Sequence, residues 1–84
     1  MDDEALRRAV AHLETGEWRA AHEIVQQDED SSVACWAHGI VHLMEGDVAN
    51  ARYWYRQAGR HFPGEKAIES EIAALRTSLP AARR

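Results

Sequence analysis

The chain is poor in cysteine and proline and has no long apolar run. Its 84 residues include one cysteine, Cys35, and two prolines. A single cysteine cannot form an internal disulfide, so nothing in the sequence indicates an oxidising compartment. The chain begins Met-Asp-Asp-Glu, the reverse of the basic start of a signal peptide, and no apolar run approaches the roughly 20 residues of a membrane span. We therefore expect a cytoplasmic protein without a membrane partner.

Basic charge is also scarce, since the formal net charge is −4. Phosphate binding needs a basic face, so we expect no nucleic-acid partner. The charge is uneven: residues 1–30 hold nine acids and three arginines, giving −6, while residues 31–84 hold five acids and seven bases, giving +2. This asymmetry favours either head-to-tail contacts or simply two solvated surfaces.

Apolar residues make up 45% of the chain, which is enough for one small globular domain. Apolar positions recur at helical spacing in five segments, separated by turn residues. The predicted helices cover residues 3–15, 17–28, 33–45, 47–60 and 65–79. Residues 33–45 are apolar over most of their circumference, so this helix should be central. We expect an all-α domain over residues 1–80, ended by Pro80, and a frayed tail at 81–84.

A short internal repeat connects the two halves of the chain. Residues 12–21 read HLETGEWRAA, and residues 42–51 read HLMEGDVANA. The matched positions keep a constant offset of 30 and are His12 and His42, Leu13 and Leu43, Gly16 and Gly46, and Ala21 and Ala51. Self-similarity at such a period is typical of stacked helical hairpins. The pattern predicts two antiparallel hairpins capped by a fifth helix.

The second copy resembles the tetratricopeptide repeat, a helix–turn–helix unit of about 34 residues with the pattern W-x2-L-G-x2-Y, A-x3-F and P. Four positions agree in type: Gly39, Ala51, Tyr55 and Pro63. Three positions depart from it: Cys35, His38 and His42. The resemblance covers about residues 5–63 and implies a right-handed stack of hairpins. Residues 45–60 are also similar to a segment of small uncharacterised bacterial and fungal proteins, which implies no activity.

The resemblance implies that the first helix of each hairpin lines a concave groove. Apolar side chains at those positions would be the partner-binding residues; they are Leu6, Val10, Leu13, Trp36, Ile40, Leu43 and Met44. The alternative is that the fifth helix folds back and buries them. We expect one helix to be too little to cover both parts, leaving an apolar patch for a protein or peptide partner or for a homodimer.

Arg52, Arg56 and Arg60 are spaced by four, beside Tyr53 and Trp54. This spacing puts the three arginines on one helix face. We expect Arg52 and Arg56 to be charges at the rim of the partner site that steer acidic partners. The alternative is a solvated face whose arginine stems cover the rings.

His38 and His42 are four residues apart, which is metal-ligand spacing on a helix, but no HExxH motif is present. We expect them to be packing residues, with no metal or other cofactor. Cys35 has no assignable base, so a buried thiol is expected instead of a nucleophile. The sequence therefore predicts a non-catalytic interaction module; the alternative is a small metal- or ligand-binding helical protein that uses His38 and His42.

Overall fold

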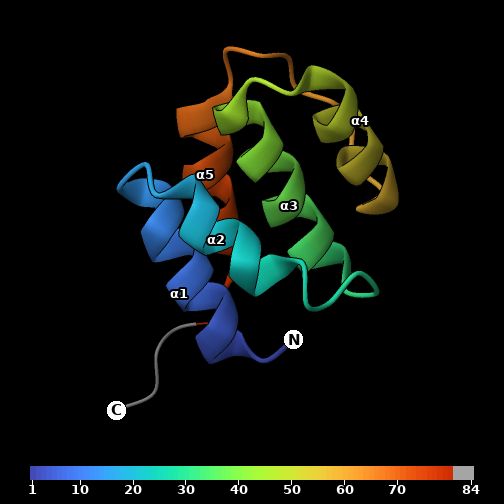
Figure 1. Cartoon of the computed structure of the whole chain (residues 1–84). Coiled ribbons are helices and arrows are strands. Elements are labelled where there is room, and N and C mark those ends of the chain that lie inside the picture. The colour runs from blue at the N-terminus through green and yellow to red at the C-terminus, as the bar shows by residue number, and fades with distance from the viewer. Residues whose placement is uncertain (81–84) are drawn as a thin grey trace.

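The computed structural model describes residues 1–80, which contain five α-helices and no strand (Figure 1). The helices are α1 (Asp3–Glu14), α2 (Trp18–Val25), α3 (Ser32–Glu45), α4 (Val48–Gln57) and α5 (Ile68–Ser78). The predicted all-α class with five helices is confirmed. The frayed tail predicted at 81–84 lies outside the described residues.

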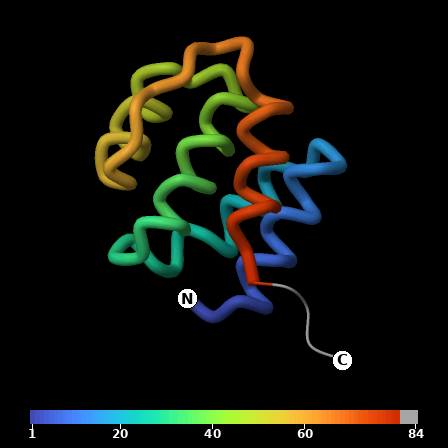
Figure 2. The backbone as a smooth tube through the Cα atoms, turned by 180° about the vertical axis from the view of Figure 1, so that it is seen from behind, coloured from blue at the N-terminus to red at the C-terminus, as the bar shows by residue number. Residues whose placement is uncertain are grey.

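The helices form two hairpins and a returning fifth helix. α1 packs against α2 and α3 packs against α4, while α2 and α3 join the two hairpins. After α4 the chain crosses over the end of the bundle, and α5 runs back between α1 and α3 (Figure 2). α3 contacts each of the other four helices, so the most apolar helix is central, as the sequence predicts.

The internal repeat corresponds to one turn that the backbone forms twice. In the first copy Gly16 has φ of +80°, and its N–H donates to the Leu13 carbonyl at 3.1 Å. The Glu17 N–H donates to the His12 carbonyl at 2.8 Å. The same pair of bonds recurs thirty residues later around Gly46, at 3.1 and 2.9 Å. These are Schellman turns, in which a left-handed glycine satisfies the last carbonyls of a helix.

A third such turn shortens α4 relative to the prediction. The sequence pattern extends this helix over residues 47–60, but the helix ends at Gln57. Gly59 has φ of +73°, and the Arg60 N–H donates to the Tyr55 carbonyl at 3.0 Å. Gly59 therefore ends the helix before it reaches Arg60, the third arginine of the series. α2 and α5 are likewise shorter than predicted.

α3 and α4 approach most closely at Gly39. A methyl group built on Gly39 would lie 2.5 Å from Cδ1 of Tyr55 and 3.4 Å from the carbonyl oxygen of Ala51. Tyr55 is fully buried, so its ring occupies the space that a side chain at Gly39 would need. The predicted close helix contact at this glycine is confirmed.

We expect Gly39→Ala to destabilise the fold even though alanine is the better helix former by about 1 kcal/mol. The added methyl overlaps a buried ring, and overpacking of this kind costs about 1–3 kcal/mol. Urea unfolding measures the change. The same substitution in a Tyr55→Leu background removes the overlap and should be neutral or stabilising. Equal destabilisation in both backgrounds would contradict this explanation.

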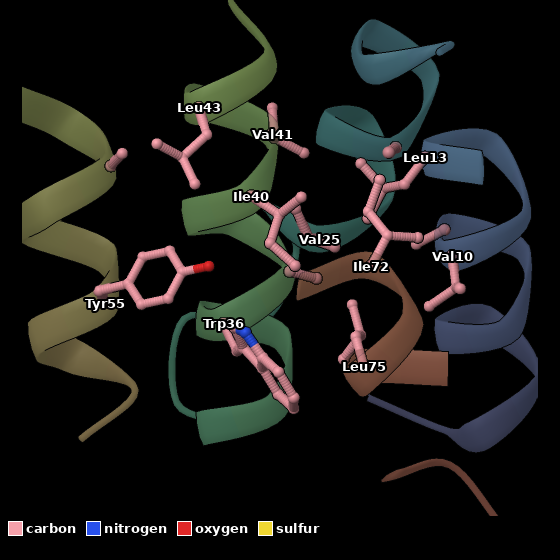
Figure 3. Close-up of a cluster of buried hydrophobic side chains, with 14 residues drawn as sticks. Val10, Leu13, Val25, Trp36, Ile40, Val41, Leu43, Tyr55, Ile72 and Leu75 are labelled. Atoms are coloured by element: carbon pink, nitrogen blue, oxygen red, sulfur yellow. The ribbon is translucent and has the colours of Figure 1, made fainter. Parts of the chain in front are cut away.

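Within residues 1–80, the apolar side chains that the sequence places in an open groove are covered instead. Six of its seven predicted residues are buried: Leu6, Val10, Leu13, Trp36, Ile40 and Leu43. Met44 is partly buried against the same core. α5 inserts Ile72 and Leu75 between α1 and α3 (Figure 3). One returning helix therefore covers both hairpins, because α1 and α3 lie close enough together for α5 to pack on both.

A carboxylate on α5 joins the last three helices. Oε1 of Glu71 accepts hydrogen bonds from the Tyr55 hydroxyl at 2.6 Å and from Trp36 Nε1 at 3.0 Å. Burial and this carboxylate both raise the pKa of the Tyr55 hydroxyl, which stays protonated as a donor. Cζ of Arg60 lies 3.5 Å from the centroid of the Trp36 ring.

At the other end of α5, Arg76 makes two hydrogen bonds to the carboxylate of Glu14, at 2.7 and 3.0 Å.

Loss of the Glu71 carboxylate should weaken the fold more than loss of one donor. Tyr55→Phe removes one hydrogen bond to a charged group and should cost about 1.5–3 kcal/mol. Glu71→Ala leaves both donors without their acceptor and should cost more. Glu69→Ala is the matched control, because Glu69 is exposed on the same helix, and it should stay within about 0.5 kcal/mol. Equal stabilities of the Glu71 and Glu69 variants would refute the role of Glu71.

Candidate functional site

Three histidines meet where the two hairpins join. His22 lies on α2, and His38 and His42 lie one turn apart on α3. Each residue offers a ring nitrogen, and these three nitrogens lie within 4.8 Å of one another. The ring centroids are separated by 4.8 Å for His22 and His38, 5.5 Å for His22 and His42, and 5.1 Å for His38 and His42. We call these three residues the histidine cluster.

The sequence identified two members of the cluster and missed the third. His38 and His42 are linked by helical spacing, whereas His22 comes from a helix sixteen or more residues away. The one signal for His22 was its place three residues before Val25, a core residue of α2. That position puts His22 beside the face that packs on α3, but no sequence motif pairs it with His38.

Trp54 of α4 covers the inner side of the cluster. Its ring stacks on His38 with centroids 3.8 Å apart and an interplanar angle of 8°. Trp54, which the sequence puts next to the arginines, is therefore buried against α3 and is not part of their outer face. Tyr53, its neighbour in sequence, points outward and is 46% exposed. The ring of His38 is held between Trp54 on one side and His42 on the other.

Burial and neighbouring charge keep His38 neutral. His38 is 3% exposed, and burial, followed by the like charges of His22 and His42, lowers its pKa from 6.5 to about 4. The ring of His42 is oriented by a hydrogen bond to Glu45, since its Nδ1 lies 2.8 Å from Oε1 of that carboxylate. A carboxylate can only accept there, so Nδ1 of His42 carries a proton and Nε2 is the ring nitrogen left for other partners.

The fold should lose stability in acid through His38. The unfolded chain takes up a proton at its ordinary pKa of 6.5, whereas the folded chain resists protonation until about pH 4. The unfolded state therefore binds more protons in that window, and the free energy of unfolding falls as pH falls from 6.5 to about 4. The loss should be on the order of 3 kcal/mol at most.

Urea unfolding with a metal chelator present measures this loss across the pH range. His38→Phe keeps a ring against Trp54 but cannot be protonated, so its stability should depend less on pH. His61→Gln is the control, because His61 is exposed and should leave the dependence as it is. An unchanged acid dependence in His38→Phe would assign the effect to other groups.

Cys35 lacks the environment of a nucleophile. It is 2% exposed, and its thiol donates to the carbonyl of Glu29 at 3.3 Å. Burial, together with the acids of the α2–α3 loop, raises the pKa of the Cys35 thiol. A thiol held in its protonated form is a poor nucleophile, which agrees with the structural role expected from the sequence.

The three arginines of the predicted stripe separate in the structure. Cζ of Arg52 lies 4.3 Å from the centroid of Phe62, and Arg60 lies over Trp36. Arg56 is exposed on the last turn of α4. Arginine therefore covers aromatic rings, as the alternative interpretation expected, but the rings are Phe62 and Trp36. Arg52 and Arg56 still share one outer face of α4.

No protein-family model, curated protein or solved structure significantly matches this chain. The resemblance to the tetratricopeptide repeat therefore stays a prediction, and so does the similarity noted for residues 45–60. Among the described residues, no helix combines the length and the apolar character needed to cross a bilayer. The fold and the side-chain geometry are thus the basis for a functional interpretation.

Proposed function

We propose that this chain is a non-catalytic interaction module that binds an acidic segment of another protein through the outer face of α4. The observation that carries the proposal is the position of Tyr53. It is the one large hydrophobic side chain exposed within residues 1–80, and it lies beside Arg52 and Arg56. Tyrosine and arginine are enriched in protein interfaces and among their strongest contacts.

The α4 face is open because α4 packs on a single helix. Within the described chain α4 packs on α3 through Ala51, Trp54 and Tyr55 on its inner side, and the Tyr55 hydroxyl also reaches Glu71 of α5. Arg52, Tyr53 and Arg56 lie on the opposite side and are exposed. The guanidinium of Arg52 rests over Phe62, which limits its freedom before a partner arrives. Such preorganisation lowers the entropic cost of binding.

Charge indicates the kind of partner. Two arginines on one helical turn, with no acidic residue between Val48 and Gln57, favour a segment rich in aspartate or glutamate. The first hairpin carries the acidic excess of this chain, so a second copy is the other source of such a segment. We propose a foreign acidic segment, because a head-to-tail contact between copies would not stop at a dimer but would build rings or open filaments.

The tetratricopeptide-like arrangement belongs to the same proposal. It is supported by two hairpins with matching turns and by Gly39 and Tyr55 at positions where that repeat has a small and an aromatic residue. α5 would be the capping half-repeat, and it would occupy the groove that longer arrays use for ligands. The interaction site would therefore be shifted to α4. A cytoplasmic location is part of the proposal and is supported by the single buried thiol of Cys35.

The proposal predicts salt-sensitive binding of acidic peptides. A panel of fluorescent 15-residue peptides, rich in glutamate and leucine and matched to lysine-rich versions, can be titrated with the full chain by fluorescence anisotropy. We expect binding of acidic peptides alone. The Arg52→Glu, Arg56→Glu double variant and Tyr53→Ala should each weaken it at least tenfold, about 1.4 kcal/mol.

Arg19→Glu is the matched control, because Arg19 is also an exposed helical arginine near an aromatic ring, Trp18. It should leave the affinity within about twofold, since rim charges away from the site contribute little. Equal weakening by Arg19→Glu would reduce the effect to net charge and refute the α4 face. Light scattering during size exclusion completes the test: a dimer that Arg52→Glu dissociates would identify a second copy as the partner.

A further inference from the structure

We propose that the histidine cluster, His22, His38 and His42, binds a divalent transition metal, with Zn²⁺ as the best-suited ion. This site is separate from the α4 face and does not depend on it. The cluster supplies three imidazole nitrogens from two helices, and it lies at the junction that holds the two hairpins together. Three histidines with an open fourth position form one of the established ligand sets for zinc.

The distances allow coordination after small side-chain rotations. Nitrogens bound to a tetrahedral Zn²⁺ at about 2.0–2.1 Å lie about 3.3 Å apart. The three candidate nitrogens already lie within 4.8 Å of one another. His38 and His42 approach with nearly parallel rings, at 20°, whereas His22 meets both nearly edge-on, at 84° and 72°. The ring of His22 thus faces the pair from across the helix junction.

The surroundings of the cluster resemble those of a supported metal site. Glu45 accepts from His42 Nδ1 at 2.8 Å, which fixes the ring and makes the opposite nitrogen the free donor. Metal-ligating histidines commonly have this kind of carboxylate partner. Asp47 brings a second carboxylate within 4.8 Å of the ligand atoms of His42 and Glu45, adding negative charge near a cation. Trp54 restricts the orientation of His38 by stacking on it.

The composition of the cluster also suits a metal. Among the described residues, His38 is a buried polar side chain in a core that is otherwise hydrophobic, and two more imidazoles meet it there. Packing alone would be served equally well by apolar residues at these positions, as it is elsewhere in the core.

Isothermal calorimetry of the full chain with ZnCl₂ alone tests the site. We expect one Zn²⁺ per chain and a rise in the melting temperature. His22→Gln should weaken the affinity at least about 10–100-fold, the range found when a supporting partner of a ligand is lost. His22 is only partly buried, so this variant should fold. His61→Gln, an exposed histidine outside the cluster, is the control and should bind as the unmodified chain does.

A second measurement keeps the proposal testable without any variant. Imidazole resonances of the five histidines can be followed by NMR as ZnCl₂ is added to the unmodified chain. We expect His22, His38 and His42 to shift together and to saturate at one equivalent, while His12 and His61 stay unchanged. Co²⁺ should give visible absorption bands of a four-coordinate site that Zn²⁺ removes. Absence of binding heat, shifts confined to His12 or His61, or an unaltered affinity in a folded His22→Gln variant would each overturn the proposal.

Discussion

The contact between the Tyr55 ring and Gly39 determines how the second half of the molecule is arranged. A glycine in the middle of α3 lets the ring of Tyr55 lie directly against the helix backbone. At that depth the hydroxyl reaches the carboxylate of Glu71, which also accepts from Trp36. One missing side chain on α3 thus positions α4 and provides the anchor for α5. A buried phenol requires a partner for its hydroxyl, and Glu71 is that partner.

This arrangement buries the apolar side chains of the helices. A protein of 84 residues buries only about 60–65% of the surface of its unfolded chain, so it has few apolar side chains to leave exposed. α5 returns across both hairpins because Ile72 and Leu75 find their packing partners there. The apolar faces of α1 and α3 are covered by a helix of the same chain. The outer side of α4 stays exposed and carries arginine and tyrosine.

The sequence was informative about local structure and less so about what lies next to what. The all-α class, the turns at Gly16 and Gly46, and the close approach at Gly39 follow from local rules and were predicted. Whether α5 covers the apolar stripe depends on chain length and on how the five helices pack together. The hydrophobic periodicity of a single helix does not contain this information. The inward position of Trp54 is not among the predictions, because the pattern places Tyr55 inward and gives no signal for a second inward aromatic one residue earlier.

The histidine cluster shows the same limit from the other side. His38 and His42 share a helix, so their spacing could be read directly, but His22 joins them only because α2 nests against α3. The metal hypothesis therefore gains its third ligand from tertiary structure and not from a motif. A bound metal would also affect how the two hairpins are held together. Glu71 connects α3, α4 and α5, whereas a metal at the cluster would connect α2 with α3. In a domain with so thin a core, an ion at that junction would tie the first hairpin to the second, where side-chain packing is the main connection.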